Sequence, residues 1–184
     1  SIQKLSQDVV NQISAGEVVE RPAHLVKELV ENCIDASSTL IHVEVAAGGR
    51  FIRGMDDGTG IKKEELELAL TRHATSKISK TDDLWALNTF GFRGEALASA
   101  AAVSQLTLIS RHKNSKEAFQ IQSRFGAFSE IDPAHRNAGT EIKIEALFEN
   151  VPARLKFLKS DAAEFSQIKN VIKAMALANP QIEF

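Results

Sequence analysis

The chain has 184 residues, of which 43% are hydrophobic and 25% are charged, and its formal net charge is -2. This composition is typical of a globular domain that buries a full core, and it excludes an affinity for nucleic acid that rests on net charge alone. Because Cys33 is the single cysteine, an internal disulfide and a cysteine-ligated zinc site are also excluded. No apolar run approaches the length that spans a bilayer, so we expect no membrane partner.

Regular patterns of apolar residues begin after an N-terminal arm, which is predicted over residues 1–20. Pro22 favours the first turn of the helix that follows this arm. Apolar residues at helical spacing predict helices over 22–36, 61–70, 95–102 and 161–178. Alternating apolar residues predict strands over 40–46, 50–55, 105–111, 117–123 and 140–146. Since hairpins outnumber crossovers, we predict an α/β fold: a two-layer sandwich with a mixed, mostly antiparallel sheet and helices on one face.

Three further segments carry local signals. Residues 71–94 are irregular and rich in Thr, Ser, Lys and Gly, which is typical of a functional loop. Asp161 and Glu164 are predicted to form a capping box at the start of the last helix. Residues 181–184 have the pattern of the start of another strand, and we therefore expect the chain to be a fragment of a longer protein.

The first long helix has two contrasting sides. At about 100° per residue, one side forms a core-facing stripe of Leu25, Val26, Leu29, Val30, Cys33 and Ile34. The opposite arc holds His24, Glu28, Glu31, Asn32 and Asp35. Three carboxylates in one arc without a lysine or arginine repel one another, and a metal ion that brings a phosphate ligand would relieve this repulsion.

A glycine-rich turn, Asp56-Asp57-Gly58-Thr59-Gly60, follows the second predicted strand. The glycines allow the backbone to pass close to a ligand, and an aspartate at a strand end can accept a hydrogen bond from an exocyclic amine such as that of adenine. A polar turn without a ligand is the alternative interpretation. At the start of the last predicted strand, Thr140 follows Gly139 and offers a hydroxyl that can bond a base or an ordered water.

The segment Gly91-Phe92-Arg93-Gly94-Glu95-Ala96-Leu97 leads from glycines directly into a helix. Free backbone N–H groups and the helix dipole favour an anion at such a place. An ordinary glycine loop before a helix is the alternative. The chain has neither a P-loop nor a G-x-G-x-x-G fingerprint, so a nucleotide would occupy another kind of pocket.

In this order along the chain, Glu28 with Asn32, the Asp56 to Gly60 turn, Gly91 to Gly94 and Gly139-Thr140 resemble the motifs of the GHKL ATPases. Longer strings are similar to one group within them, the MutL family of DNA mismatch repair proteins, and they lie at residues 12–22, 72–77, 91–97 and 151–158. The resemblance runs over essentially the whole chain.

The resemblance implies a Bergerat-type GHKL ATP-binding fold over residues 21–184, after the arm at residues 1–20. A second subdomain and a C-terminal dimerisation domain would lie outside this chain. Glu28 corresponds to the catalytic glutamate that polarises the attacking water, and Asn32 to the asparagine that binds magnesium. The family's lysine that reaches the γ-phosphate belongs to the second subdomain, so we expect hydrolysis by this chain to be slow.

The same resemblance assigns the nucleotide-binding residues. Asp56 corresponds to the aspartate that reads adenine, Thr140 supports that contact, and Gly58 and Gly60 pass beside the nucleotide. Residues 71–97 correspond to the ATP lid. The positions in the lid that are expected to bind the nucleotide are Thr75, Ser76, Lys77, Gly91, Phe92, Arg93, Gly94, Glu95, Ala96 and Leu97.

The implied function is binding and hydrolysis of ATP with Mg2+ in DNA mismatch repair. ATP would close the lid and drive a homodimer through the N-terminal domains, which would coordinate mismatch-recognition and strand-incision repair proteins. Weak, non-specific DNA binding is expected as well. The implied location is the cytoplasm of a bacterium, associated with the nucleoid, or the nucleus of a eukaryote.

Two other functions stay open: a nucleotide-dependent binding module without turnover, and another GHKL ATPase. Asp57 stands where the family often has asparagine, and it would weaken nucleotide binding if it faced the phosphates. A solvated helix face is predicted, with a basic strip for DNA as the alternative, from Arg154, Lys156, Lys159, Lys169 and Lys173.

Overall fold

The computed structural model describes residues 3–7, 9–10, 19–71 and 95–184 of the chain. The described strands are β1 (Ile41–Ala46), β2 (Phe51–Asp56), β3 (Gln105–Arg111), β4 (Ala118–Arg124), β5 (Ala127–Phe128), β6 (Asp132–Ala134) and β7 (Gly139–Glu145). They form one seven-stranded sheet in the order β1-β2-β7-β3-β4-β5, in which β6 also pairs with β4. All of these ladders are antiparallel, so the predicted sheet type is confirmed.

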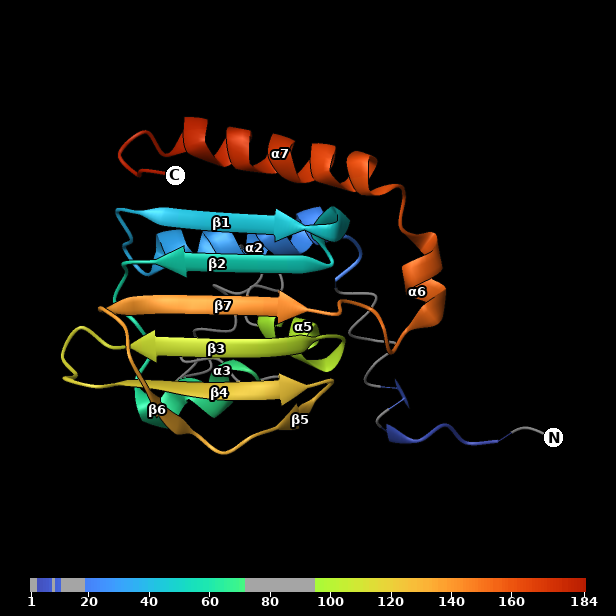
Figure 1. The fold of residues 1–184 in the computed structure, drawn as a ribbon, viewed down its shortest axis with the longest axis horizontal. Helices are drawn as coiled ribbons and strands as arrows, with labels where there is room; N and C mark the ends of the chain where they lie inside the picture. Colours follow the sequence, from blue (N-terminus) through green and yellow to red (C-terminus); the bar gives the residue numbers. More distant parts are fainter. Residues whose placement is uncertain (1–2, 8, 11–18, 72–94) are drawn as a thin grey trace, which may run out of the picture.

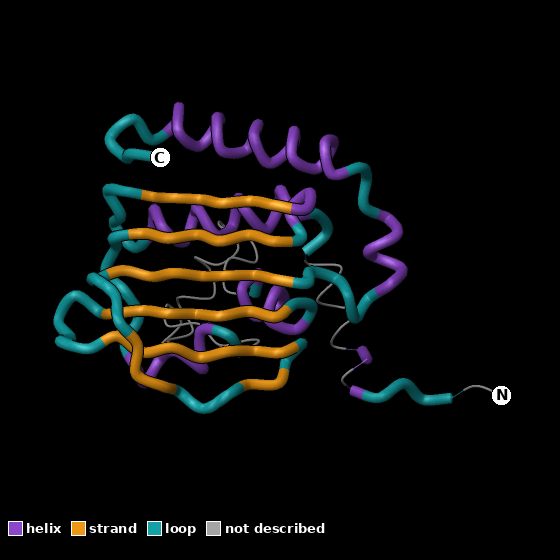
Figure 2. Tube along the Cα trace, in the orientation of Figure 1, coloured by secondary structure: helices purple, strands orange, loops and turns teal. Residues whose placement is uncertain are grey.

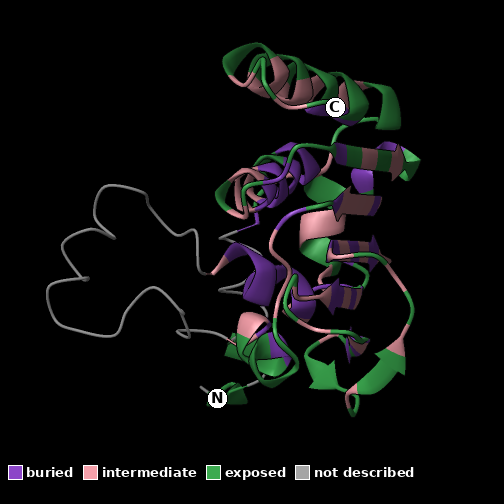
Figure 3. Cartoon of the chain, turned by 90° about the vertical axis from the view of Figure 1, so that its left-hand side faces the viewer, coloured by how far each residue is buried: buried purple, intermediate pink, exposed green. Residues whose placement is uncertain are grey.

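The described helices are α2 (Pro22–Asp35), α3 (Leu66–Ala69), α5 (Ala96–Ala102), α6 (Pro152–Phe157) and α7 (Asp161–Ala178), with the 3-10 turns η1 (Ala47–Gly49) and η2 (Lys63–Glu65). Figure 1 shows α2, α3 and α5 behind the sheet, with α7 running along the β1 edge. Figure 2 shows the same arrangement in the chain trace, and Figure 3 shows helices on one side of the strands, with the C-terminal helix above them at the sheet edge. The predicted two-layer α/β sandwich is therefore confirmed.

α2 forms because its apolar residues recur at helical spacing and because proline occupies its first turn. Arg21 is the N-cap residue, and Pro22 is the first residue of the helix. A proline has no backbone N–H, and this costs nothing here, because an N–H at the first helical position has no acceptor inside the helix. The buried residues of α2 are Pro22, Ala23, Leu25, Val26, Leu29, Val30 and Cys33. The predicted core-facing stripe is confirmed, with Ile34 half-buried at its edge.

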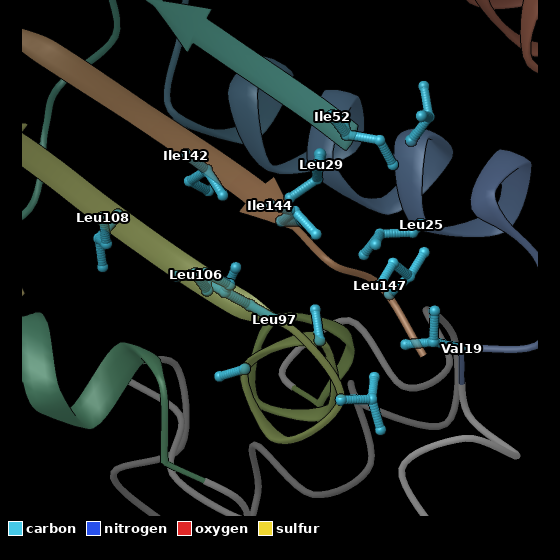
Figure 4. Packing of buried hydrophobic residues seen from close by; sticks show 14 of the residues in the cluster. Val19, Leu25, Leu29, Ile52, Leu97, Leu106, Leu108, Ile142, Ile144 and Leu147 are labelled. Atoms are coloured by element: carbon cyan, nitrogen blue, oxygen red, sulfur yellow. The ribbon is translucent and has the colours of Figure 1, made fainter. Parts of the chain in front are cut away.

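The main core lies between this stripe and the sheet. In Figure 4, Leu29 of α2 lies beside Ile52 of β2 and Ile144 of β7, and Leu97 of α5 lies beside Leu106 of β3. Full burial of one such side chain contributes about 1.5–3 kcal/mol. The core therefore fixes α2 over β2 and β7, and it fixes α5 over β3.

The predicted strands agree with β1, β2, β3, β4 and β7 to within one residue at each end. The helix predicted over 61–70 is instead the turn η2 followed by the four-residue helix α3. The sequence patterns missed β5, β6 and α6, because these elements are too short to show a period. At residues 181–184, Glu183 forms an isolated parallel bridge with Leu40 at the sheet edge.

The capping box predicted for α7 is wrong. The N-cap is Ser160, whose Oγ accepts the N–H of Ala163 at 3.2 Å. Glu164 is instead buried, and its Oε1 accepts hydrogen bonds from Arg21 Nη1 at 2.8 Å and from the N–H of Lys159 at 2.9 Å. Within the described ranges, each helix is too short or too polar to cross a bilayer.

Candidate functional site

Three polar side chains form a row at one end of the sheet, which we call the polar row: Asp56, Thr140 and Ser110. Asp56 of β2 pairs with Thr140 of β7, and Thr140 pairs with Ser110 of β3. Residues directly opposite on antiparallel strands point to the same face of the sheet. The exposed fractions are 8% for Asp56, 8% for Thr140 and 1% for Ser110, so the row is a buried polar floor on the face that the helices cover.

Asp56 is held from two directions. Its Oδ1 accepts the N–H of Gly58 at 2.8 Å, which orients the carboxylate. On the α2 side, the Cys33 thiol hydrogen-bonds with this carboxylate. Burial, and then the negative charge of Asp56, raise the pKa of Cys33 far above its ordinary value, so the thiol keeps its proton at neutral pH. Because an ionised carboxylate only accepts hydrogen bonds, Asp56 suits a ligand that presents an N–H donor.

The hydroxyls of Thr140 and Ser110 form a pair beside Asp56. Their Oγ1 and Oγ atoms are 2.8 Å apart. Ser110 Oγ also accepts the N–H of Ile61 at 2.7 Å and lies 3.0 Å from the carbonyl oxygen of Gly139. Ser110 therefore joins β3, β7 and the loop that follows β2.

The loop after β2 is clamped between the end of α2 and the end of β3. The N–H of Thr59 donates to the carbonyl of Ala36 at 2.9 Å, and the N–H of Lys113 donates to the carbonyl of Thr59 at 2.8 Å. Gly60 has φ +77, and a Cβ there would lie 2.0 Å from the carbonyl oxygen of Arg111. A glycine is thus required at this position by the protein's own backbone.

Asp57 points away from the polar row. Its Oδ1 accepts the N–H groups of Thr39 at 2.8 Å and Leu40 at 3.0 Å, and its Oδ2 accepts the Thr39 hydroxyl at 2.5 Å. Asp57 therefore fixes the turn between α2 and β1. The effect of Asp57 on nucleotide binding stays a prediction.

The polar arc of α2 is partly covered. The Glu28 side chain is 15% exposed, and its Oε1 lies 3.8 Å from His24 Nε2. Glu31 and Asn32 are half-buried, whereas Asp35 is exposed. In the part of the chain that the structure describes, no three His, Cys, Asp or Glu side chains are grouped as metal ligands. An ion at Asn32 would therefore take most of its ligands from a bound molecule and from water.

The lid positions are described only from Glu95 onward. Glu95 is the N-cap residue of α5, and Ala96 and Leu97 are 5% and 8% exposed. Because the latter two side chains pack in the core, a contact with phosphate at these positions would use their backbone N–H groups. The other predicted lid contacts lie outside the described residues: Thr75, Ser76, Lys77, Gly91, Phe92, Arg93 and Gly94.

The sequence patterns missed three residues of this site. Ser110 continues the buried alternation of Leu106 and Leu108 in β3, and a serine in such a pattern could have been noticed. Cys33 was assigned only to the core. Arg136, in the loop before β7, donates from Nη2 to the carbonyl oxygen of Asp56 at 3.0 Å, and nothing in the sequence around it predicts that contact.

The residues of the alternative basic strip lie on separate elements. Arg154 and Lys156 belong to α6, where the Arg154 guanidinium lies 5.9 Å from the centre of the Phe157 ring. Lys169 and Lys173 are exposed on α7. Lys159 is exposed in the connection between the two helices.

A helix-backed antiparallel sheet, with a buried aspartate before a glycine turn and a polar arc on the first long helix, defines a class of ATP-binding domains. The family described as histidine kinase-, DNA gyrase B- and HSP90-like ATPase matches residues 20–151. The chain therefore belongs to this family, which is the GHKL group of ATPases.

Within the family, the chain corresponds to the N-terminal ATPase domain of MutL DNA mismatch repair proteins. It is 52% identical over 184 residues to the MutL protein of Coxiella burnetii, covering all of this chain and 32% of that protein. It is 53% identical over 186 residues to MutL of Actinobacillus succinogenes, covering 29% of that protein. The chain thus spans about a third of the length of these curated relatives.

Solved structures give the same result. The Aquifex aeolicus MutL ATPase domain complexed with ADP superposes with a TM-score of 0.74 at 34% identity, over 90% of this chain and 58% of that chain. A K252N variant of the same ATPase domain has a TM-score of 0.72 at 33% identity, over 90% of this chain and 56% of that one.

Proposed function

We propose that this chain binds ATP together with Mg2+ and hydrolyses it, as the nucleotide-dependent domain of a DNA mismatch repair protein. The observation that carries the proposal is the Asp56 carboxylate: it is buried, oriented by Gly58, and next to the Thr140 hydroxyl. An ionised carboxylate has about four acceptor sites, of which Gly58 uses one, and an amino group of adenine would be a matching donor. The ADP complex of the Aquifex aeolicus MutL ATPase domain supports this choice of ligand.

For the chemistry, we assign Glu28 as the residue that orients and deprotonates the attacking water, since it lies on the covered part of the polar arc. Asn32, one helical turn further, would contribute its amide oxygen to Mg2+. This fits the ion, because magnesium takes few protein ligands and fills its shell with phosphate oxygens and water. Bound magnesium would neutralise the charge that develops during phosphoryl transfer.

We further propose that residues 71–97 form the lid over the phosphates and that the arm at residues 1–20 takes part in ATP-dependent dimerisation. Residues 21–184 would then be the ATPase domain, and the remaining parts of the relatives would supply a second subdomain and a dimerisation domain. The proposed partners are a second copy, mismatch-recognition and strand-incision proteins, and DNA bound weakly. The bacterial cytoplasm, or a nucleus, is the proposed location.

Calorimetric titration with ADP tests the binding site. Asp56→Asn keeps an oxygen that can accept from Gly58 but removes the charge, so ADP affinity should fall by roughly 10- to 100-fold. Asp57→Asn is the matched control, because this neighbouring carboxylate points away from the polar row. It should leave the affinity within about twofold. Equal ADP affinity for Asp56→Asn and the wild type would overturn the proposal.

A further inference from the structure

We propose that His24 is a positioning residue for Glu28, and that it holds the Glu28 carboxylate in the orientation that the attacking water requires. The inference rests on the proposed function, since it requires Glu28 to act on that water. It adds a residue of the polar arc to which neither the sequence motifs nor the family resemblance assigned a role.

His24 stands one helical turn before Glu28 on α2. Residues four apart on a helix are neighbours on its surface, and the Cα–Cβ bonds tilt toward the helix N-terminus. The Glu28 side chain therefore leans over the turn that holds His24, and His24 Nε2 lies 3.8 Å from Glu28 Oε1. This is about 0.8 Å longer than a typical N–H···O hydrogen bond. A change of the His24 torsions within one rotamer well can close the difference.

The two side chains differ in exposure as a base and its support should. The Glu28 side chain is 15% exposed and its Oε2 atom is buried, whereas the His24 side chain is 50% exposed. One oxygen of the carboxylate thus lies in the interior, and the other lies beside an imidazole at the surface. His24 is not among the buried residues of α2, so its side chain is not needed to fill the core.

A glutamate base gains from such support because its last torsion is soft. The bond that carries the carboxylate group has a broad, roughly two-fold distribution, unlike the staggered bonds before it. A donor at one oxygen narrows this distribution. It still leaves lone pairs for water, since an ionised carboxylate has about four acceptor sites. Nε2 of histidine carries a proton both in the imidazolium and in one neutral tautomer, so His24 can donate in either form.

The orientation of the base should affect the chemical step and not the binding of nucleotide. A misplacement of about 1 Å at a reacting centre can cost roughly 10²-fold in rate. Loss of His24 would only widen the range of Glu28 orientations, so we expect a smaller effect, about 10-fold in the rate of hydrolysis. ADP has no γ-phosphate for a water to attack, so its affinity should not depend on His24.

Single-turnover hydrolysis of ATP with Mg2+ by the 184-residue chain tests this inference through His24→Leu. The matched control is His42→Leu, because His42 Nε2 lies 3.2 Å from Glu44 Oε1 in another exposed histidine–glutamate pair, on β1. His24→Leu should lower the rate constant about 10-fold, while ADP affinity by calorimetry and Tm stay at the wild-type values. His42→Leu should change none of these three quantities.

His24→Gln tests whether the donor at Nε2 is what matters. The glutamine amide nitrogen places an N–H donor at a similar reach and does not titrate, so this variant should recover most of the rate that His24→Leu loses. A His24→Leu rate constant equal to or above the wild-type value would overturn the inference. So would a His24→Gln variant as slow as His24→Leu, or a loss of ADP affinity that parallels the loss of rate.

The Glu28→Gln variant separates this inference from the proposed function. If the wild type does not hydrolyse ATP, or if Glu28→Gln hydrolyses it at the wild-type rate, the proposed chemistry is wrong and the inference fails with it. If Glu28→Gln loses hydrolysis and His24→Leu does not, the inference alone fails.

Discussion

Asp56 and Asp57 are adjacent in the chain, but their carboxylates bind different parts of the molecule. Asp56 is buried in the polar row and accepts the N–H of Gly58, whereas Asp57 accepts three hydrogen bonds from Thr39 and Leu40 on the far side of the strand end. The alternation of a β-strand explains this division, because successive side chains point to opposite faces. One residue of the pair is therefore available for a ligand, and the other stabilises the fold.

Asp57 should make stability depend on pH in the acid range. Burial disfavours its charge, but hydrogen bonds from the Thr39 hydroxyl and the N–H groups of Leu40 and Thr39 outweigh this and keep the pKa of Asp57 below its usual value. A lowered pKa in the folded state gives stability that is present above the unfolded-state pKa, about 3.9, and is lost as pH falls through the lower folded-state value.

The measurement is the free energy of unfolding of the wild type and Asp57→Asn at neutral pH and near pH 3. At neutral pH the substitution should cost about 1 kcal/mol or less, since solvent screens an exposed carboxylate. Near pH 3 the difference should shrink. A difference that stays constant between the two pH values would show that the charge of Asp57 is not the source of the stabilisation.

Glu28→Gln should separate ATP binding from hydrolysis. The amide keeps the size of the side chain but cannot take a proton from water, so the single-turnover hydrolysis rate should fall by about 10²- to 10⁴-fold while ATP affinity is retained. Glu31→Gln is the control, because Glu31 lies in the same polar arc one turn away. Hydrolysis rates that fall equally in both variants would contradict the assignment of Glu28. If neither the wild type nor the variants hydrolyse ATP at a measurable rate, the binding module without turnover is favoured.

Sequence periodicity predicted most of this fold because its long elements have clean patterns. The strands alternate between a buried and an open face, and α2 carries one continuous apolar stripe, so each is visible in the sequence alone. The short elements β5, β6 and α6 have no full period. The predicted helix has the bounds of α7, but its cap was assigned to Asp161 instead of Ser160, because Asp161 and Glu164 imitate a capping box. Tertiary contact with Arg21 decides where Glu164 points.

For the site, the sequence predicted Asp56 and Thr140 but missed what holds them. The sequence pattern shows that polar residues stand at the ends of predicted strands. It does not reveal which strands are neighbours in the sheet. Ser110 meets Thr140 only because β3 pairs with β7, although the two residues are separated by about 30 positions. Arg136 reaches Asp56 through a loop whose course no local pattern determines.

Gly54→Ala should stabilise the protein. Gly54 is an interior strand residue that lines a small apolar cavity of about 10 Å³ under α2, and a Cβ added there would meet nothing within 4 Å. Alanine reduces the freedom of the unfolded chain without a clash in the folded one, so the gain should be about 0.5–1 kcal/mol, or a few degrees in Tm. Thermal unfolding without nucleotide measures this.

Gly139→Ala is the counterpart of that substitution. Gly139 has φ +125, and its Cβ would lie 2.1 Å from the carbonyl oxygen of Asp56, so the strand pairing beneath the polar row must shift. This variant should lose at least about 1 kcal/mol of stability. Equal Tm changes for the two variants would contradict the packing described at both positions.

Arg21→Ala should be far more damaging than Arg50→Ala, although both remove an arginine that pairs with α7. Arg21 Nη1 lies 2.8 Å from Glu164 Oε1, and the Glu164 side chain is 1% exposed, so the substitution leaves a buried carboxylate without its counter-charge. The expected loss is about 3 kcal/mol. Arg50 and Asp161 are 44% and 65% exposed at 3.5 Å, and that pair should contribute below about 0.5 kcal/mol. Denaturant unfolding of the two variants measures both losses.

Adding Glu164→Leu to Arg21→Ala should recover most of the stability, because it removes the unpaired charge. A double variant as unstable as Arg21→Ala would show that Arg21 acts through its packing on Phe157 instead.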